Sequence, residues 1–453
     1  MKTTAFRVWA AAIAVSASLA SWLSPQAARA DERTLPVEEH RLANGLRVLL
    51  APDPSLDDVT VLVRYNVGSS DDPPGKEGLV HVTQHLMFDG SPHVAAGQHQ
   101  RRLEEVGGTR IEGGTSREDT TFRDTVPPGR LPLVLWLEAD RMGLSGDALD
   151  AATVQREWKV ADAEHDVGHH NGAARAGWDA LWGEIYPEGH PYHRIQAADV
   201  GQGVFGLDDV RAILRAGFGA SNAALAIAGP FDPQATFALV ERYFGSVPAR
   251  TPIRRPRASE SRIPDVRLDV SASVAREFVD VAFRAPPSGT PQDLAMDVLS
   301  TILNDTNGPL HRELVERGIA LNAGATEQSK KAGSLFLLSA SAPRGGDPEA
   351  LVATIERIVG DLATTLTPAQ LDDAHRVRRD ALLADFQTSS GRAHRVLGTG
   401  KLDATSYDAI DLDLLRAVAR EVFVPSRRVV MVVRNSPKSP WSGVVARREE
   451  HLP

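Results

Sequence analysis

The sequence predicts an α+β protein made of two homologous halves, and three observations support this. Strand-like and helix-like stretches alternate along the chain, and their order recurs in the second half. Proline, arginine and serine are concentrated at 248–267, as in a linker. Five pairs of matched residues share one offset (416 − 211 = 205): Val210, Arg211, Ala212, Phe218 and Ser221 match Leu415, Arg416, Ala417, Phe423 and Ser426. Such a repeat is too long for a solenoid and indicates two domains, 34–247 and 268–436, followed by a tail at 437–453.

The composition is that of an ordinary globular protein with an ample core. Of the 453 residues 42% are hydrophobic and 24% are charged, and the formal net charge of −9 argues against nucleic acid or an anionic membrane surface as a partner. Residues 1–30 resemble a signal peptide, with a basic start, an apolar stretch and the small-x-small site Ala28-Arg29-Ala30, so we expect a periplasmic or secreted protein. A single amino-terminal membrane anchor is the alternative reading. No other segment is apolar enough to span a membrane, and without cysteine no disulfide can form.

The elements of the first half can be assigned in order from their residue patterns. A strand, an Asn44-Gly45 turn and a second strand open the half at 40–50. Further strands are expected at 59–67, 120–126 and 223–228. Helices are expected at 78–90, up to Gly107-Gly108, at 131–142, from 151 to about 180, and at 210–218. In the second half we expect strands at 279–283, 335–342 and 429–433, and a helix at 292–303.

Two histidines in the expected helix at 78–90 have the spacing of a zinc site. His81 and His85 stand four residues apart in an apolar run without proline, so both imidazoles leave the same helical face. The order His-x-x-Gln-His differs from the inverzincin pattern His-x-x-Glu-His only at Gln84. Metal binding is therefore expected, and the residue between the histidines decides the chemistry.

Several further motifs give the chain a family likeness. They include Leu42-x-Asn44-Gly45-Leu46, Tyr65-Asn66-Val67-Gly68-Ser69, Leu103-Glu104-Glu105-x-Gly107-Gly108, Leu137-Glu138-Ala139-Asp140-Arg141-Met142, Tyr186-Pro187, Gly189-His190-Pro191-Tyr192 and Leu310-x-x-x-Leu314-Val315-x-x-x-Ile319-Ala320. With them the sequence resembles, almost end to end, the pitrilysin/insulinase family of inverzincin metallopeptidases, in the small bacterial form similar to mitochondrial processing peptidase subunits. The resemblance implies two domains, each an antiparallel-rich sheet with helices on one face. It also implies a homodimer, or a heterodimer with an active paralogue, that encloses a chamber for unfolded peptides.

The resemblance also suggests the remaining metal ligand. The family takes its third zinc ligand from a glutamate on a downstream helix and has a second glutamate two turns earlier. Glu164 and Glu157 fit these places for one zinc ion, with Glu164 as ligand and Glu157 as its outer support. Asp162 is the rival ligand if the helix is two residues shorter. The plainer alternative is that all three acidic residues lie on a solvated helix face.

Two departures from the family pattern concern catalysis. In the inverzincin pattern the glutamate between the histidines takes a proton from water and returns it to the leaving amine, whereas the amide of Gln84 can do neither. Asp89, Glu104 and Glu105 are the candidates for a substitute carboxylate, but nothing in the sequence places them at the metal. In the second half Leu321 stands where many members have a tyrosine that holds the substrate carbonyl.

We therefore expect a catalytically impaired, zinc-binding subunit that pairs with an active metallopeptidase and binds extended peptides. Two alternatives stay open at this point. One is an active zinc metalloendopeptidase whose base is a carboxylate from elsewhere in the chain. The other is a homodimeric, non-enzymatic peptide-binding protein.

Overall fold

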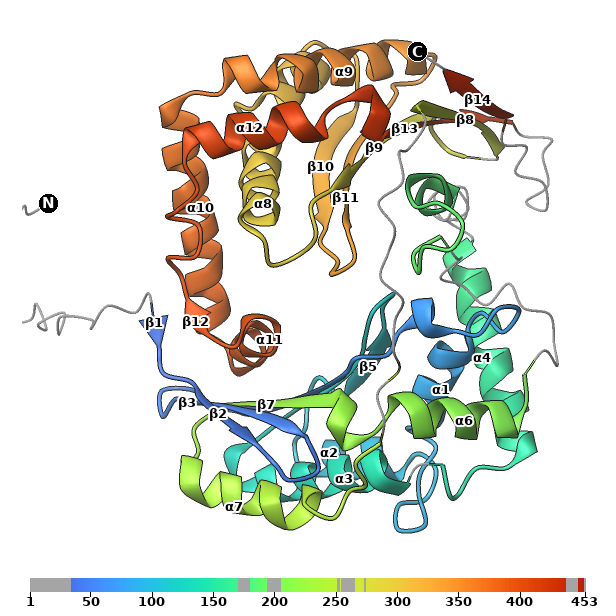
Figure 1. Cartoon of the computed structure of the whole chain (residues 1–453), viewed down its shortest axis with the longest axis vertical. Helices are drawn as coiled ribbons and strands as arrows, with labels where there is room; N and C mark the ends of the chain where they lie inside the picture. The colour runs from blue at the N-terminus through green and yellow to red at the C-terminus, as the bar shows by residue number, and fades with distance from the viewer. Residues whose placement is uncertain are drawn as a thin grey trace, which may run out of the picture.

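The structure is a computed structural model, and it describes residues 34–144, 146–169, 180–193, 205–250, 253, 265–272, 274–436 and 447–451. The expected signal peptide at 1–30 and most of the expected linker lie outside these residues. Two layered halves follow each other along the chain, and each is built around a six-stranded mixed sheet (Figure 1). In the part of the chain that is described, no helix has the length and apolar character needed to cross a membrane.

The first sheet has the strand order β2-β3-β7-β4-β6-β5. In that order the strands are Glu38–Arg41, Arg47–Pro52, Ala223–Gly229, Val59–Tyr65, Thr120–Val126 and Glu112–Thr115. Strands β3 and β7 pair in parallel, and the other neighbours are antiparallel. The expected hairpin is confirmed, since β2 and β3 pair across the turn in which Gly45 has a φ of 91°, a conformation that favours glycine.

The second sheet repeats this arrangement, with the order β14-β8-β13-β9-β11-β10. In that order the strands are Arg447–His451, Asp265–Ala272, Arg428–Asn435, Phe278–Ala285, Ser334–Ser341 and Asn322–Gln328. The one parallel pair among its described strands is β8 with β13, in the same place as β3 with β7. Strand β8 begins at Asp265, inside the stretch expected as linker, and β14 lies in the stretch expected as tail. A short ladder of β1 (Thr34–Leu35) with β12 (Leu402–Asp403) joins the start of the described chain to the second half.

The offset seen in the sequence reappears in the elements. Helix α6 (Leu207–Gly217) corresponds to α12 (Leu412–Val422), because 412 − 207 = 205. Each is followed by a 3-10 turn and then by the central strand of its sheet, β7 or β13, again 205 residues apart (428 − 223 = 205). The α+β fold with two homologous halves is confirmed.

The remaining helices begin where the sequence supplies caps. The caps Asp232, Thr290, Asp347, Thr367 and Thr388 each accept a hydrogen bond from a backbone N–H of the first turn, and proline opens all of these helices except the last. These helices are α7 (Pro233–Phe244), α8 (Pro291–Asn304), α9 (Pro348–Thr365), α10 (Pro368–Phe386) and α11 (Ser389–Thr399). The first half also contains α1 (Leu79–Leu86), α2 (Gln98–Glu105), α3 (Leu131–Leu144) and α4 (Ala151–His169).

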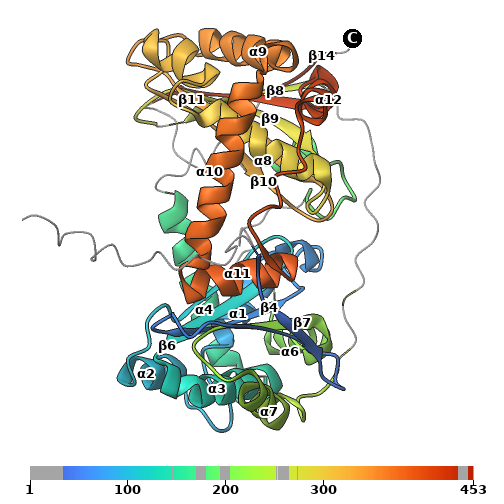
Figure 2. The same ribbon diagram turned by 90° about the vertical axis from the view of Figure 1, so that its left-hand side faces the viewer.

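The helices of each half cover one face of its sheet, as expected, and the opposite face is covered by the other half. Successive strand residues point to opposite faces, so Val48 and Leu50 of β3 join the core of the first half. Leu49 and Ala51 join a core with residues of the second half. Helix α11 lies on this second face, against β3, β4 and β7 (Figures 1 and 2).

Residues 180–193 of the first half cover the second sheet in return. Trp182, Tyr186 and Tyr192 are buried against strands β8, β9, β11 and β13. The Tyr186 hydroxyl donates to the Ser334 carbonyl at 2.9 Å. The tyrosines of the two motifs at 186–192 therefore serve to join the halves.

Candidate metal centre

Helix α1 presents its two histidines on the side that its apolar residues do not use. Leu79, Val80, Val82, Thr83, Gln84 and Leu86 are buried, whereas His81 and His85 are half-buried. The helix begins after Gly78, whose φ is 91°, and the Asp72 carboxylate accepts hydrogen bonds from the backbone N–H groups of Gly78 and Val80 at 2.7 and 2.8 Å. Burial raises the pKa of Asp72 to about 7. The start of the helix, and hence the direction of the imidazoles, is fixed by these contacts.

The two imidazoles bring their Nε2 atoms together. The Nε2 atoms of His81 and His85 are 3.1 Å apart, and the rings stand nearly perpendicular, with an interplanar angle of 86°. Both nitrogens cannot carry a proton at this distance without repulsion. The pair is therefore suited to sharing one proton or one cation.

Glu164 of α4 completes a group of three possible ligands. Its Oε2 lies 3.8 Å from His81 Nε2 and 3.5 Å from His85 Nε2. Zinc bonds to nitrogen and oxygen of about 2.0–2.2 Å in a tetrahedron place the ligand atoms about 3.3–3.6 Å apart, so one ion fits among these atoms. Asp162 is not among the residues that converge there. The donor set of two imidazoles and one carboxylate, with a position left for water, is one that catalytic zinc sites use.

Glu157 lies behind His85, two turns before Glu164 on α4. Its Oε2 is 3.7 Å from His85 Nδ1, the ring nitrogen that points away from the group. A carboxylate in this place can hold a metal-binding imidazole in its orientation and tautomer. Arg156 bridges Glu157 at 3.1 Å to Asp89 at 2.9 Å. Burial, and next the Glu157 carboxylate, raise the pKa of Asp89.

Gln84 is a residue of α1, and its side chain is buried where this helix packs against the edge strand β5. Gln84 is only 5% exposed. A Cβ atom at position 113 would lie 2.6 Å from the Nε2 atom of Gln84, which is too close. Glycine at position 113 therefore leaves room for the amide. Gln84 follows His81 by three positions, so the two side chains are neighbours on the helix. The other two sequence candidates lie elsewhere: Glu104 and Glu105 are exposed on α2, where Glu104 accepts a hydrogen bond from Gln100 at 2.7 Å.

Leu321 lies outside this group, directly before β10, and is 49% exposed. An exposed leucine cannot donate a hydrogen bond to a carbonyl, as a tyrosine hydroxyl could. The second half thus contributes no hydroxyl from this position.

A second group of convergent side chains is buried and was not anticipated. His99, Asp124 and Glu138 lie within 4.8 Å of one another through single ligand atoms. Arg141 forms ion pairs with Glu138 and, at 3.8 Å, with Asp124, and its guanidinium lies over the rings of Phe122 and Phe88. Burial lowers the pKa of His99 to about 3 and raises that of Glu138 to about 8. Because the arginine already supplies the cation, this group is an internal ion cluster. The motif at 137–142 was the sequence signal for it.

Comparisons with protein families agree with this geometry. Residues 47–175 match the family model described as insulinase (peptidase family M16), and residues 205–377 match the one described as the peptidase M16 inactive domain. The first match lies within the first half and contains the metal group, whereas the second begins just before α6 of the first half and extends to α10 of the second.

Similar proteins and structures point the same way. The chain is 27% identical over 401 residues to an uncharacterized zinc protease of Mycobacterium tuberculosis, covering 85% of this chain and 87% of that one. It is 25% identical over 370 residues to the zinc protease PqqE of Helicobacter pylori, covering 78% and 81%.

Among solved structures, a protease from Helicobacter pylori superposes with a TM-score of 0.78 at 23% identity, covering 88% of this chain and all of that one. Pitrilysin superposes with a TM-score of 0.70 at 18% identity, covering 91% of this chain and 46% of that one. These two likenesses concern the fold. Taken with the family matches in both halves, they show that this chain belongs to the insulinase family of peptidases, peptidase family M16.

Proposed function

We propose that the chain is a zinc-binding member of its family in which peptide hydrolysis is impaired, and which binds extended peptides as the partner of an active metallopeptidase. One observation carries this proposal. His81, His85 and Glu164 offer ligand atoms at the spacing that zinc requires, while the residue between the histidines is Gln84.

The ligand roles follow from the donor atoms. His81 and His85 would bind through Nε2 and Glu164 through Oε2, and Glu157 would orient His85 through Nδ1. A zinc ion held there would polarise a peptide carbonyl and acidify a water molecule. A relative from Helicobacter pylori and one from Mycobacterium tuberculosis are named as zinc proteases, which supports zinc over other divalent metals.

The proposed impairment follows from the amide of Gln84. This amide can hold a water molecule by a hydrogen bond, but it takes up no proton near neutral pH and returns none to a leaving amine. Loss of a general base costs about 10²–10⁴-fold in rate. Glutamine has nearly the shape of glutamate, so folding and the metal ligands are left intact.

Peptide binding would use the β5 edge of the first sheet, where no further strand pairs among the described residues. Strand β5 ends the order of that sheet and pairs there with β6. Its residues Glu112, Gly113 and Gly114 are exposed, and α1 lies directly beside it. An extended peptide can add to such an edge by backbone hydrogen bonds, which tolerates many sequences.

The test compares the wild-type chain with its Gln84→Glu variant. Both are loaded with zinc and mixed with an internally quenched fluorogenic peptide. We expect wild-type cleavage close to background and an increase of about 10²–10⁴-fold in the variant. Gln100→Glu, an exposed glutamine on α2, is the matched control and should change nothing. Rapid cleavage by the wild type that a chelator abolishes would overturn the proposed impairment.

An active zinc endopeptidase is the second candidate, and one observation favours it. Glu157 lies 3.7 Å from His85, and Asp89, whose pKa is raised, lies across Arg156 from it. If one of these carboxylates served as base, Glu157→Gln or Asp89→Asn would abolish the cleavage that the wild type shows, even at a zinc concentration that saturates each variant.

The proposed pairing has its own test. Light scattering of the purified chain, alone and mixed with a family member that has an intact His-x-x-Glu-His helix, distinguishes the partnerships. A heterodimer supports pairing with an active relative. A stable homodimer that ignores that relative would instead support a peptide-binding protein without enzyme partner.

A further inference from the structure

Arg156 of α4 lies between two carboxylates that come from different elements. Its Nε donates to Glu157 Oε1 at 3.1 Å, and its Nη2 donates to Oδ2 of Asp89, in the loop after α1, at 2.9 Å. The side chains of both carboxylate residues are 15% exposed, whereas that of Arg156 is 53% exposed. The planar guanidinium offers its donors in fixed directions, so it joins α4 to the end of α1 with a defined geometry.

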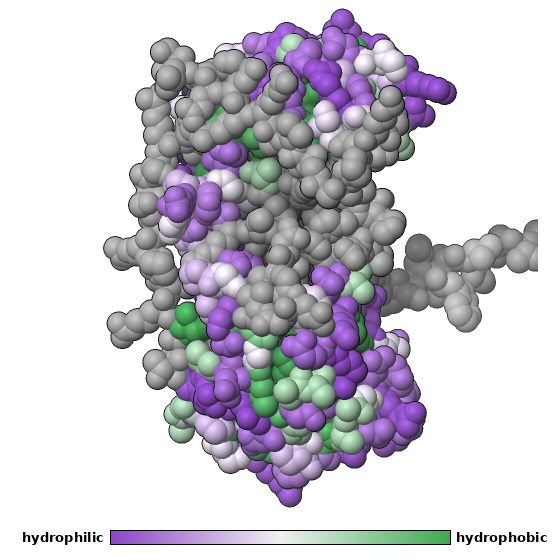
Figure 3. Space-filling view, turned by 90° about the vertical axis from the view of Figure 1, so that its right-hand side faces the viewer, coloured by the Kyte–Doolittle hydropathy of each residue, from purple (hydrophilic) through white to green (hydrophobic). Residues whose placement is uncertain are grey.

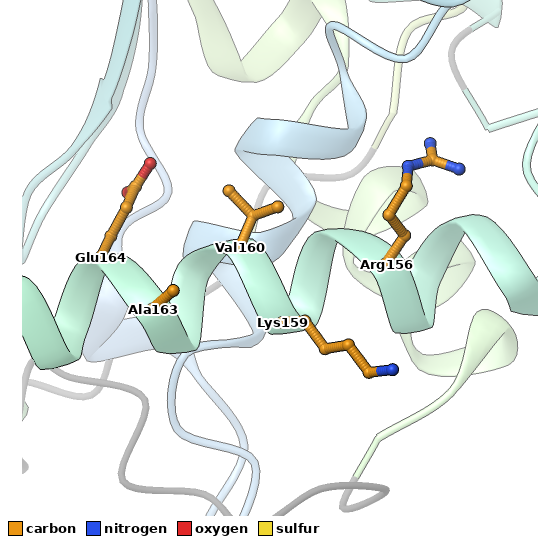
Figure 4. A pocket seen from close by; sticks show the side chains of 5 residues that line it. All are labelled: Arg156, Lys159, Val160, Ala163 and Glu164. Carbon is orange, nitrogen blue, oxygen red and sulfur yellow. The ribbon is translucent and has the colours of Figure 1, made fainter.

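Helix α4 presents Arg156 on the same side as the candidate metal ligand Glu164. Arg156, Val160 and Glu164 are spaced by four residues, and Figure 4 shows all three pointing to one side of the helix, along a pocket of about 570 Å³. Lys159 points to the other side in that view. Helix α4 lies at the right of Figure 1, on the side that Figure 3 turns toward the viewer, where hydrophilic side chains of the first half reach the surface among hydrophobic ones.

The two oxygens of the Glu157 carboxylate have separate partners. Oε1 accepts the hydrogen bond from Arg156, and Oε2 lies 3.7 Å from His85 Nδ1. Because both oxygens belong to one planar group, the bond to the arginine fixes the rotation of the carboxylate and with it the place of Oε2. A carboxylate that faces Nδ1 keeps a proton on that nitrogen and leaves Nε2 free for a metal ion.

The guanidinium also separates two like charges. Asp89 and Glu157 both bond to the same side chain, so their carboxylates are neighbours, and salt screens partly buried charges much less than exposed ones. Without the cation between them, the two carboxylates would repel each other. Glu157 would then turn out of its place behind His85.

We infer that Arg156 is a positioning residue of the metal centre, which is anchored by Asp89 and holds the Glu157 carboxylate against His85. Arg156 supplies no ligand atom and acts on the metal group through Glu157. The inference rests on the proposed zinc binding and goes beyond it by naming the residue that keeps a ligand aligned.

The charge of Arg156 alone predicts an effect of the opposite sign. Removal of a cation near a metal site reduces the repulsion of the metal ion, so it should strengthen binding. Arg156 and Glu164 are eight residues apart (164 − 156 = 8), about 12 Å along the helix, which is beyond the Debye length of about 8 Å at physiological ionic strength. Weaker zinc binding without Arg156 would therefore report positioning and not charge.

The test measures the zinc affinity of the full chain by competition with a zinc-binding dye, without any peptide. Arg156→Met keeps the apolar stem and should weaken zinc binding about tenfold, the lower end of what loss of an outer partner costs. Arg156→Lys should recover part of this loss, because an ammonium restores the charge but not the planar fork. Lys159→Met is the matched control. It removes a positive charge that is nearer to Glu164 in the helix (164 − 159 = 5), and it should not weaken zinc binding.

A double-mutant cycle shows whether Arg156 acts through Glu157. In the Glu157→Gln background, Arg156→Met should cost less than about twofold in zinc affinity, because the carboxylate that it positions is gone. Urea unfolding of the metal-free chains should give similar midpoints for wild type and Arg156→Met, since a half-exposed ion pair adds little to stability.

Each outcome bears on a different claim. Zinc affinity unchanged in Arg156→Met, or a full tenfold loss that persists in the Glu157→Gln background, would overturn the positioning role and leave zinc binding standing. Absence of zinc binding by the wild-type chain would overturn the proposed function and this inference with it.

Discussion

Glu164 and Asp162 lie two residues apart on α4, and a helix turns by about 100° per residue. Their side chains therefore leave the helix in nearly opposite directions, so only one can face the histidines of α1. Glu164 does, within 3.8 Å of both Nε2 atoms. Its side chain is also 56% exposed, so its affinity for a metal ion would depend on the two imidazoles beside it.

The first residue-scale prediction separates the two carboxylates. Glu164→Gln should lower zinc affinity by more than about 100-fold, because it removes a charged ligand, and Glu157→Gln should lower it by about 10–100-fold through the orientation of His85. Asp162→Asn removes the same charge from the same helix and should leave the affinity unchanged. Competition with a zinc-binding dye measures all three. Equal losses in Asp162→Asn and Glu164→Gln would contradict the assignment.

The histidine pair could be predicted from sequence because both residues belong to one helix, where spacing alone fixes the face. The choice between Glu164 and Asp162 could not, because it depends on the rotation of α4 against α1, which no local pattern determines. The ion cluster of His99, Asp124, Glu138 and Arg141 was not predicted for the same reason, because its members come from three different elements.

A second residue-scale prediction concerns Glu327 on β10. Burial, and next the carboxylates of Asp297 and Asp293, raise the pKa of Glu327 to about 10. Arg378 and the Tyr407 hydroxyl already pair with Asp297, at 3.1 and 2.6 Å. The folded chain thus keeps a proton on Glu327 at pH values where the unfolded chain has lost it. The contribution of Glu327 to stability is therefore fully present below the ordinary value of 4.5 and is lost as the pH rises toward 10.

Glu327→Gln should remove this dependence, because glutamine resembles the protonated glutamate. We expect equal unfolding midpoints in urea at pH 4.5 and a gain of about 1–3 kcal/mol for the variant at pH 8.5. Glu316→Gln, an exposed position in the same half, serves as control. Parallel pH profiles of wild type and Glu327→Gln would refute the prediction.

At the scale of elements, α1 and α8 occupy equivalent places in the two halves. Helix α1 follows β4 and precedes β5 and β6, and α8 follows β9 and precedes β10 and β11, the corresponding strands of the second sheet. The sequence of α8 contains no histidine. The repeat therefore preserves the fold in both halves and the metal group in one.

Helix α11 shows what the repeat could not predict. Its apolar residues Ala393, Val396 and Leu397 mark a buried face, but nothing in the sequence says that this face belongs to the sheet of the other half. The contact is polar as well: the hydroxyls of Thr60 and Ser389 are 2.7 Å apart, and Arg64 donates to the Leu397 carbonyl at 2.6 Å. The sequence pattern of a helix shows that one of its faces is buried. It does not show which surface that face packs against, because this depends on residues far away in the sequence.

The element-scale prediction uses two arginines of α11. Arg392 is 7% exposed and pairs with Asp53 of the first half, whereas Arg395 is more exposed and pairs with Asp385 at 2.6 Å. Arg392→Ala removes a buried guanidinium and leaves the half-buried Asp53 carboxylate with only its hydrogen bonds from Ser55, so it should cost about 1–3 kcal/mol. Arg395→Ala should cost less than about 1 kcal/mol. Urea unfolding measures both, and similar losses would show that the contact between the halves contributes little.

At the scale of the whole molecule, each half supplies a cover for the sheet of the other. Helix α11 lies on the first sheet, and residues 180–193 lie on the second. The second contact also includes hydrogen bonds. The Glu118 carboxylate accepts one from the Lys331 backbone N–H at 2.9 Å and another from the Tyr192 hydroxyl. Separating the halves would expose two apolar sheet faces at once, so the connecting chain is not what keeps them together.

The last prediction tests this directly by cutting the connection. A specific protease site is inserted at 254–264 and cleaved in the folded protein. The two fragments should elute together in gel filtration, because α11 still packs on the first sheet and residues 180–193 still pack on the second. Both fragments should then unfold in urea at one common midpoint, since the second face of each sheet is buried only by residues of the other fragment. Adding Arg392→Ala should lower that midpoint without splitting it. Fragments that elute separately in native buffer would show that the covalent link, and not the packing of each half on the sheet of the other, holds the molecule together.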